Sequence, residues 1–186
     1  MNKLKIILVM TSLNIVLSSS GCDRERDESS DDRLTLEKVN YSGNKLRIDG
    51  YYYENFDSRN NPYISVFFLY ENGIILYGSS FSVDQIIKQE ERYRNGFHAS
   101  NAAKFKYYWG VFQINGDKIK YEKWVPVEGP LFTVTYEGVI LNDTTFVINK
   151  NYITKEGKKK EPGEIYWEYH FKQFSPKPDS TNRFIP

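Results

Sequence analysis

The stretch Trp109-Gly110-Val111-Phe112-Gln113-Ile114-Asn115-Gly116-Asp117-Lys118-Ile119 contains the pattern that decides the fold. Apolar and polar residues alternate on both sides of Asn115-Gly116, and alternation with a period of two is typical of a strand with one buried face. Asn-Gly between two such runs favours a type I′ turn, in which both central residues need a positive φ. The stretch therefore predicts an antiparallel hairpin over residues 107–125.

The same pattern recurs along most of the chain. Asn72-Gly73 separates two further apolar runs, and Asn142-Asp143 separates another pair. Together the runs predict eight strands, at residues 45–54, 63–71, 74–81, 107–114, 117–125, 131–141, 144–153 and 164–174. Eight antiparallel strands in hairpin order favour an up-and-down barrel, because a closed sheet has no exposed edge. We therefore expect an all-β fold with one short helix.

The length of each turn fixes which residues share a face of the sheet. A two-residue turn at Asn72-Gly73 places Phe68 on the same face as Ile75, and Leu69 on the same face as Ile74. Both faces of this hairpin are then apolar, so another element has to cover one of them.

The candidate cover is a helix over residues 83–94. Ser82 and Gln85 match a capping box at its start, and Asn95-Gly96 provides a stop at its end.

For the hairpin of 107–125, a two-residue turn predicts an apolar face with Phe112 and a polar face with Lys120.

The first 21 residues have the order of an export signal. Lys3 and Lys5 precede a short apolar run over residues 6–17, and small residues then lead to Cys22. The run is shorter than the roughly 20 residues that a membrane-spanning helix needs. We therefore expect residues 1–21 to be a signal peptide that is removed on export.

Residues 18–22 resemble the lipobox of bacterial lipoproteins, with Ser19 standing where most lipoboxes carry leucine. The resemblance implies that Cys22 becomes the lipid-bearing first residue of the mature chain, anchored to a membrane. The alternative is an ordinary cleaved signal followed by a chance cysteine.

The residues after Cys22 contain no apolar side chain up to Asp32, which predicts a flexible tether over 22–33 and a single folded domain over 34–186. The acidic start of the tether resembles the signal that sends Bacteroidetes-type lipoproteins to the outer face of the outer membrane. This implies a lipid-anchored protein at the cell surface. The alternative is a spacer that holds the domain off a periplasmic leaflet.

The composition excludes several classes of protein. The 25 basic and 24 acidic residues nearly balance, and loss of Lys3 and Lys5 with the signal leaves the balance close to zero, so nothing points to nucleic acid. The single cysteine excludes an intramolecular disulfide.

Few side chains in the sequence suggest catalysis. His98 and His170 lie on different elements without metal-ligand spacing, and no serine stands in a Gly-x-Ser-x-Gly turn. Two carboxylate pairs are present, Glu122 with Glu137 and Glu164 with Glu168. Each glutamate lies on a strand beside lysines or turns, where we interpret it as surface charge. We therefore expect that the protein is not an enzyme and that it binds neither a metal ion nor a cofactor.

Three tryptophans, 15 tyrosines and 12 phenylalanines give the chain an unusual aromatic content. The arrangement of strands, and the stretch 109–119 as its central hairpin, resemble the lipocalin-like domains of bacterial lipoproteins. An eight-stranded barrel is just wide enough for side chains or one small ligand. We therefore interpret a set of inward aromatics as core or pocket lining: Tyr53, Phe112, Tyr121 and Trp167.

Two hypotheses for function stay open. The first is a non-catalytic, lipid-anchored cell-envelope protein that binds a small apolar or amphipathic ligand in its barrel. The second is a surface module that recognises a glycan or a protein through exposed aromatics, with Trp109, Trp124 and Tyr51 as candidates.

Overall fold

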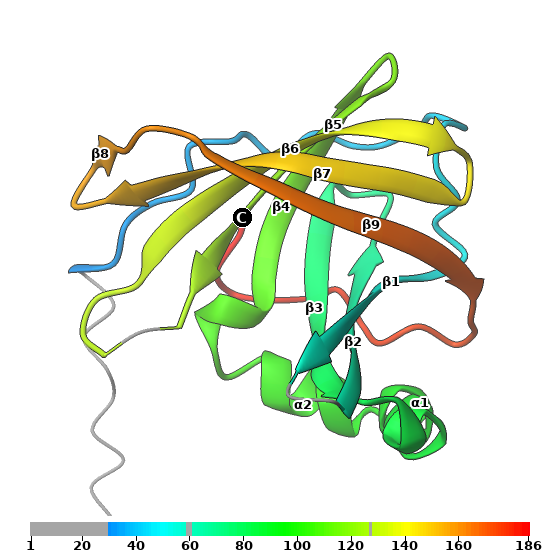
Figure 1. Ribbon diagram of the computed structural model, residues 1–186. Coiled ribbons are helices and arrows are strands. Elements are labelled where there is room, and N and C mark those ends of the chain that lie inside the picture. Colours follow the sequence, from blue (N-terminus) through cyan, green and yellow to red (C-terminus); the bar gives the residue numbers. More distant parts are fainter. Residues whose placement is uncertain (1–29, 59–60, 127) are drawn as a thin grey trace, which may run out of the picture.

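The computed structural model describes residues 30–58, 61–126 and 128–186, and its strands form a closed antiparallel barrel (Figure 1). The strands are β1 (Gly50–Ser58), β2 (Asn61–Leu69), β3 (Ile74–Ser82), β4 (Trp109–Asn115), β5 (Lys118–Val125), β6 (Phe132–Asn142), β7 (Thr145–Lys155), β8 (Lys158–Lys159) and β9 (Gly163–Gln173). The helices are α1 (Ile86–Arg94) and α2 (Phe97–Ala102), with 3₁₀ turns η2 (Val83–Gln85) and η3 (Lys106–Tyr108).

Consecutive strands pair from β1 to β7, and β9 closes the barrel by pairing with both β7 and β1. The short strand β8 pairs only with the end of β7 and stands outside the ring of eight. The predicted fold, an all-β up-and-down barrel of eight antiparallel strands, is confirmed.

The turn between β2 and β3 differs from the prediction. The backbone N–H of Gly73 donates to the carbonyl of Tyr70, Tyr70 pairs with Ile74, and Gly73 has a φ of 78°. The loop is therefore three residues long and ends with a left-handed glycine, rather than being a two-residue type I′ turn. As a result Ile74 shares the outer face with Phe68, and the predicted assignment of faces in β3 is wrong next to the turn.

The turn between β4 and β5 lies one residue later than predicted. Asn115 pairs with Lys118, so Gly116 and Asp117 form the loop, and Gly116 has a φ of 61°. This displacement changes the pairing by two residues, which leaves every side chain on its predicted face. Phe112 accordingly points into the barrel.

Apolar side chains pack on both faces of the sheet. The inner core includes Tyr52, Phe67, Leu69, Ile75, Phe112, Tyr121, Phe146 and Tyr169. The outer core includes Tyr51, Phe68, Leu76, Tyr93, Trp109, Val111, Trp124, Phe174 and Ile185. Residues of the helices and of the C-terminal tail thus cover the outside of β1 to β5 (Figure 1).

The expected helix covers this outer face, but its start and its surroundings differ from the prediction. Residues 83–85 wind as the 3₁₀ turn η2, so α1 begins at Ile86, and neither Ser82 nor Gln85 makes a side-chain capping bond. Gly96 provides the predicted stop with a φ of 77°, and the short helix α2 follows it directly. One face of the hairpin of β4 and β5 was predicted to be polar and exposed. This prediction is wrong near Trp109, because the helical segment covers that part of the face.

The segment before β1 closes the end of the barrel opposite the cavity. Residues 45–49 were expected to begin the first strand, but the backbone N–H of Arg47 instead bonds to the carbonyl of Asp143 in the β6–β7 turn. Leu46 is buried in the inner core, and its backbone N–H and carbonyl both bond to the hydroxyl of Tyr41. β1 therefore starts only at Gly50.

Candidate functional site

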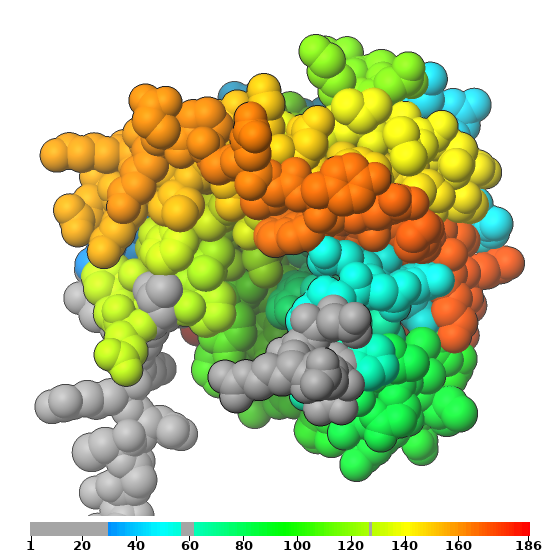
Figure 2. Space-filling model, in the orientation of Figure 1, coloured from blue at the N-terminus to red at the C-terminus, as the bar shows by residue number. Residues whose placement is uncertain are grey.

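The open end of the barrel contains a cavity of about 340 Å³. Six strands supply its wall, with the residues Glu54, Phe56, Ser65, Phe67, Ile75, Tyr77, Ser80, Tyr121, Lys123, Tyr136, Trp167 and Tyr169. Figure 2 shows the surface hollowed between β9, in orange, and the yellow-green side of the molecule that holds β6. The cavity is the candidate functional site.

The cavity exists because side-chain size changes along the barrel. Towards the closed end, aromatic rings of Tyr52, Phe146 and Phe112 fill the interior, and the Tyr41 ring packs on Phe112 at 5.7 Å between centroids. Towards the mouth, Ser65 and Ser80 face the interior and leave space. Since an eight-stranded barrel is only just filled by side chains, small residues at one end are enough to open a pocket there.

One acidic and one basic side chain face the cavity, Glu54 from β1 and Lys123 from β5. Glu54 on β1 is partly buried, and this burial raises its pKa to about 7. Lys123 on β5 is also partly buried, and its burial lowers its pKa to about 8. Removal from water disfavours the charged form of each group, which explains the opposite directions of the two shifts.

Tyrosine hydroxyls supply the remaining polar groups of the wall. The hydroxyl of Tyr77 lies 2.6 Å from that of Ser80. Burial raises the pKa of Tyr136 to about 12, and it also raises the pKa values of Tyr121 and Tyr169. These hydroxyls are therefore neutral hydrogen-bonding groups at physiological pH.

The residues expected to line a pocket divide into three groups. Tyr121 and Trp167 line the cavity. Phe112 points into the barrel but packs in the inner core and is not part of the cavity wall. Tyr53 lies on the outer face, where its ring contacts those of Tyr51 and His170, because its neighbour Tyr52 takes the inward position.

The aromatics expected on an exposed recognition surface are buried. Trp109 is 0% exposed and donates its indole N–H to the carbonyl of Ala102. Trp124 is 3% exposed and donates to the carbonyl of Asp32. Tyr51 is 1% exposed and bonds to Glu90 of α1. The prediction of their exposure is wrong, because helices and terminal segments cover the face on which they lie.

The side chains considered for catalysis have structural surroundings. His98 is buried in α2 with its Nε2 2.9 Å from the carbonyl oxygen of Tyr77, whereas His170 lies on the outer face of β9. Glu122 is buried rather than on the surface, and it binds the N-terminal segment. Within residues 30–58, 61–126 and 128–186, no group of three or more His, Cys, Asp or Glu side chains could hold a metal ion.

Sequence reasoning did not select Glu54 and Lys123. A signal was present, since Glu54 follows the inward Tyr52 by two residues and Lys123 follows the inward Tyr121 by two. Alternation therefore places both charges inside the barrel.

No family model, no curated protein and no solved structure matches this chain. None of the helices in the described part of the chain is long and apolar enough to cross a membrane. Cys22 and the proposed signal lie outside the described residues.

Proposed function

We propose that this chain is a non-catalytic, lipid-anchored protein of the cell envelope that binds a small amphipathic molecule in the mouth of its barrel. The observation that carries the proposal is the cavity at the open end of the barrel, whose wall combines aromatic rings with a few polar groups. Small-molecule sites are usually concave and mostly apolar, and start at about 300 Å³.

The wall suits a ligand with a flat or apolar body. The rings of Tyr121 and Tyr136 stack at 4.7 Å, and the ring of Trp167 lies 5.4 Å from that of Tyr136. The edges of these rings, and the faces that do not stack on one another, offer apolar contact area and preferred stacking geometries to a ligand. The hydroxyls at the ring edges and at Ser65 supply directional contacts for a polar end.

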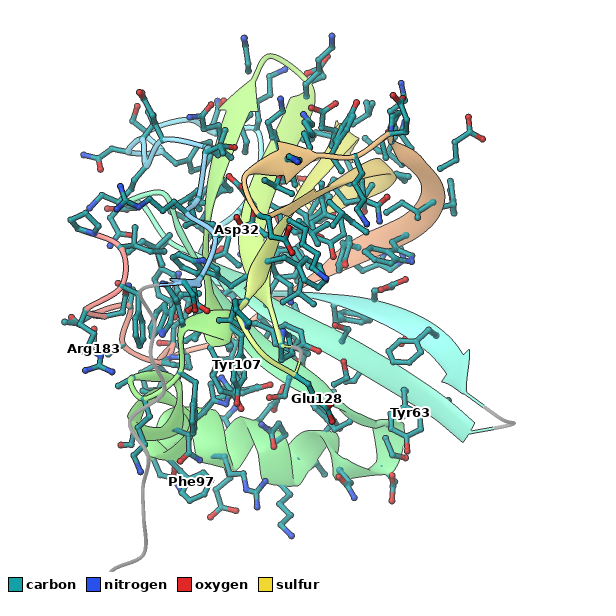
Figure 3. The ribbon with its side chains drawn as sticks, turned by 90° about the vertical axis from the view of Figure 1, so that its left-hand side faces the viewer. Asp32, Tyr63, Phe97, Tyr107, Glu128 and Arg183 are labelled. Carbon is teal, nitrogen blue, oxygen red and sulfur yellow. The ribbon has the colours of Figure 1, made fainter. Side chains whose placement is uncertain are left out.

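The N-terminal segment supports a position of the barrel mouth near a membrane. The described chain begins beside the mouth, where Asp32 accepts hydrogen bonds from the backbone N–H groups of Glu156 and Gly157 in the β7–β8 hairpin (Figure 3). An extended chain from a lipid on Cys22 to Ser30 spans at most about 30 Å. An anchor at Cys22 would therefore hold the mouth of the barrel close to the bilayer surface.

The alternative function, recognition of a glycan or a protein through exposed aromatics, has no support from its candidate residues. Trp109, Trp124 and Tyr51 each have their polar atom bonded within the protein. A ligand could reach them only if the covering segments detached.

A cavity-filling substitution tests the binding site. The exported protein is titrated in lipid nanodiscs with N-phenyl-1-naphthylamine, a neutral apolar dye, and the signal of empty nanodiscs is subtracted because the dye also enters lipid. Ser65→Phe places a ring in the cavity and should weaken binding at least tenfold, whereas Ser42→Phe, at an exposed position before β1, should leave it unchanged. Equal binding by both variants would overturn the site.

A second experiment tests the anchor. Mass spectrometry of the intact protein, extracted gently from its own membrane, should find acyl chains on Cys22 and a cleaved signal. Cys22→Ala should lose the acyl mass and leave the membrane fraction. An unmodified Cys22 in the membrane fraction would contradict the proposal of a lipid anchor.

A further inference from the structure

We propose that the cavity selects amphipathic ligands with an anionic head group, which pairs with the ammonium group of Lys123. This inference rests on the proposed function and specifies the class of ligand. It depends on the positions and partners of the charged groups that face the cavity.

Within the described chain, the ammonium group of Lys123 has no carboxylate partner. Its Nζ lies 4.0 Å above the ring centroid of Tyr77, and among the described residues it forms no ion pair. A ring face compensates part of the cost of removing an ammonium group from water, but less than a hydrogen-bonded anion does. A ligand anion at this point would supply the missing counter-charge.

Glu54 faces the same cavity but does not neutralise Lys123. Within the described chain its carboxyl makes no hydrogen bond or ion pair. Its negative charge contributes to the raised pKa values of Tyr121 and Tyr169. With a pKa near 7, Glu54 is only partly ionised at neutral pH, whereas Lys123, with a pKa near 8, stays mostly protonated. The cavity therefore becomes net positive as the pH falls through neutrality, because Glu54 loses its charge before Lys123 is affected.

The other groups of the wall do not change this sign. β2 contributes Ser65 and Phe67, and β3 contributes Ile75, Tyr77 and Ser80, all uncharged. β6 and β9 contribute Tyr136 and Tyr169, whose hydroxyls burial keeps neutral, together with Trp167. An anion is consequently favoured over a cation of the same shape.

The test uses three probes with one ring system and different charges: 2-naphthylacetate, 2-(2-naphthyl)ethanol and 2-(2-naphthyl)ethylammonium. Calorimetric titration of the exported protein at pH 7 should show the acetate binding at least tenfold more tightly than the ammonium compound. Affinity for the acetate should fall from pH 6 to pH 9, because Glu54 gains negative charge and Lys123 loses positive charge over this range.

Variants assign the preference to one residue. Lys123→Met should reduce acetate affinity about tenfold and reduce affinity for the neutral alcohol much less, because only the acetate loses an opposite charge. Lys120→Met is the matched control, since Lys120 lies on the same strand but pairs with Glu137 outside the cavity, and it should change neither. Glu54→Gln should tighten acetate binding at pH 8, where Glu54 is otherwise ionised, and thereby remove most of the decline between pH 6 and pH 8.

The possible failures are distinguishable. If the alcohol binds and the acetate gains nothing over it, or if Lys123→Met leaves the acetate unaffected, the anionic preference is wrong while the binding site stands. Tighter binding of the ammonium compound would assign the head group to Glu54 and overturn the inference. If none of the three probes nor the neutral dye binds, the proposed function itself fails.

Discussion

The carboxylate oxygen Oε2 of Glu122 lies 2.7 Å from the backbone nitrogen of Thr35, although 87 positions separate the two residues. The same oxygen accepts the backbone N–H of Leu36, and Oε1 accepts the hydroxyl of Thr133. A fully buried carboxylate thus fastens the N-terminal segment to the outside of the barrel, where that segment covers Trp124.

We expect Glu122→Ala to lower the free energy of unfolding by about 2–4 kcal/mol, because it leaves several buried donors without an acceptor. Urea denaturation measures this loss, and limited proteolysis should find residues 30–40 more susceptible. The control is Glu137→Ala, which removes a partly exposed ion pair with Lys120 and should cost less than about 1 kcal/mol. Similar losses for the two variants would contradict a fastening role for Glu122.

Gly78 and Tyr93 should show coupled effects on stability. The hydroxyl of Tyr93 donates to the carbonyl of Gly78 at 2.6 Å, and a Cβ on Gly78 would lie 2.7 Å from that hydroxyl oxygen. Gly78→Ala should therefore cost about 1–3 kcal/mol through crowding. It should cost less in the Tyr93→Phe background, where the hydroxyl is absent, and a double-mutant cycle in urea measures the difference. Additive losses would show that the contact is not tight.

Glu90 should hold α1 on the barrel. Its Oε1 accepts the hydroxyl of Tyr51 at 2.8 Å and the ammonium group of Lys172 at 2.7 Å. Burial opposes ionisation, but these bonds prevail and lower the pKa of Glu90. Its contribution to stability should therefore be present above the ordinary glutamate pKa and be lost as the pH falls through the lower folded value.

Glu90→Gln should accordingly reduce stability by about 1–2 kcal/mol at pH 7 and by less at pH 3. Hydrogen exchange should report faster opening of residues 86–94. A loss that is the same at both pH values would indicate that the charge of Glu90 does not matter.

Glu54 should have the opposite effect on stability. Its folded pKa of about 7 lies above its ordinary value of 4.5, so ionisation is harder in the folded chain. The resulting cost appears as the pH rises above 4.5 and is complete above about 7. Glu54→Gln should be more stable than the unaltered protein at pH 8, by about 1 kcal/mol given that the cavity is open to solvent, and equally stable at pH 4. Denaturation midpoints at the two pH values test this, and no gain at pH 8 would contradict it.

Alternation and turn residues predicted the barrel because successive side chains of a strand point to opposite faces of the sheet, whatever the rest of the chain does. The displaced turn at Gly116 left Phe112 and Tyr121 on their predicted face, since the pairing moved by two residues. The three-residue loop at Gly73 moved the pairing by one and reversed Ile74 and Ile75. Two-residue and three-residue loops differ little in energy, so the Asn-Gly pair alone does not determine which of them forms.

The candidate site was only partly predictable. Tyr121 and Trp167 were expected to point inwards and do line the cavity, whereas Tyr53 was assigned to the wrong face. Trp109 and Trp124 were expected outside the barrel, which is correct, but their exposure depended on elements distant in the sequence. The chain gave no local indication that Asp32 and Ala102 would bond to their indole groups.

The sequence by itself determined a period of two, the positions of the reversals within one residue, and the inward or outward parity of most strand residues. Only the tertiary structure decided that a second layer buries the outer aromatics, and that space remains at one end of the barrel beside Glu54 and Lys123. The physical reason is that parity follows from the backbone of each strand. Burial and free volume instead depend on segments that meet only after the barrel has closed.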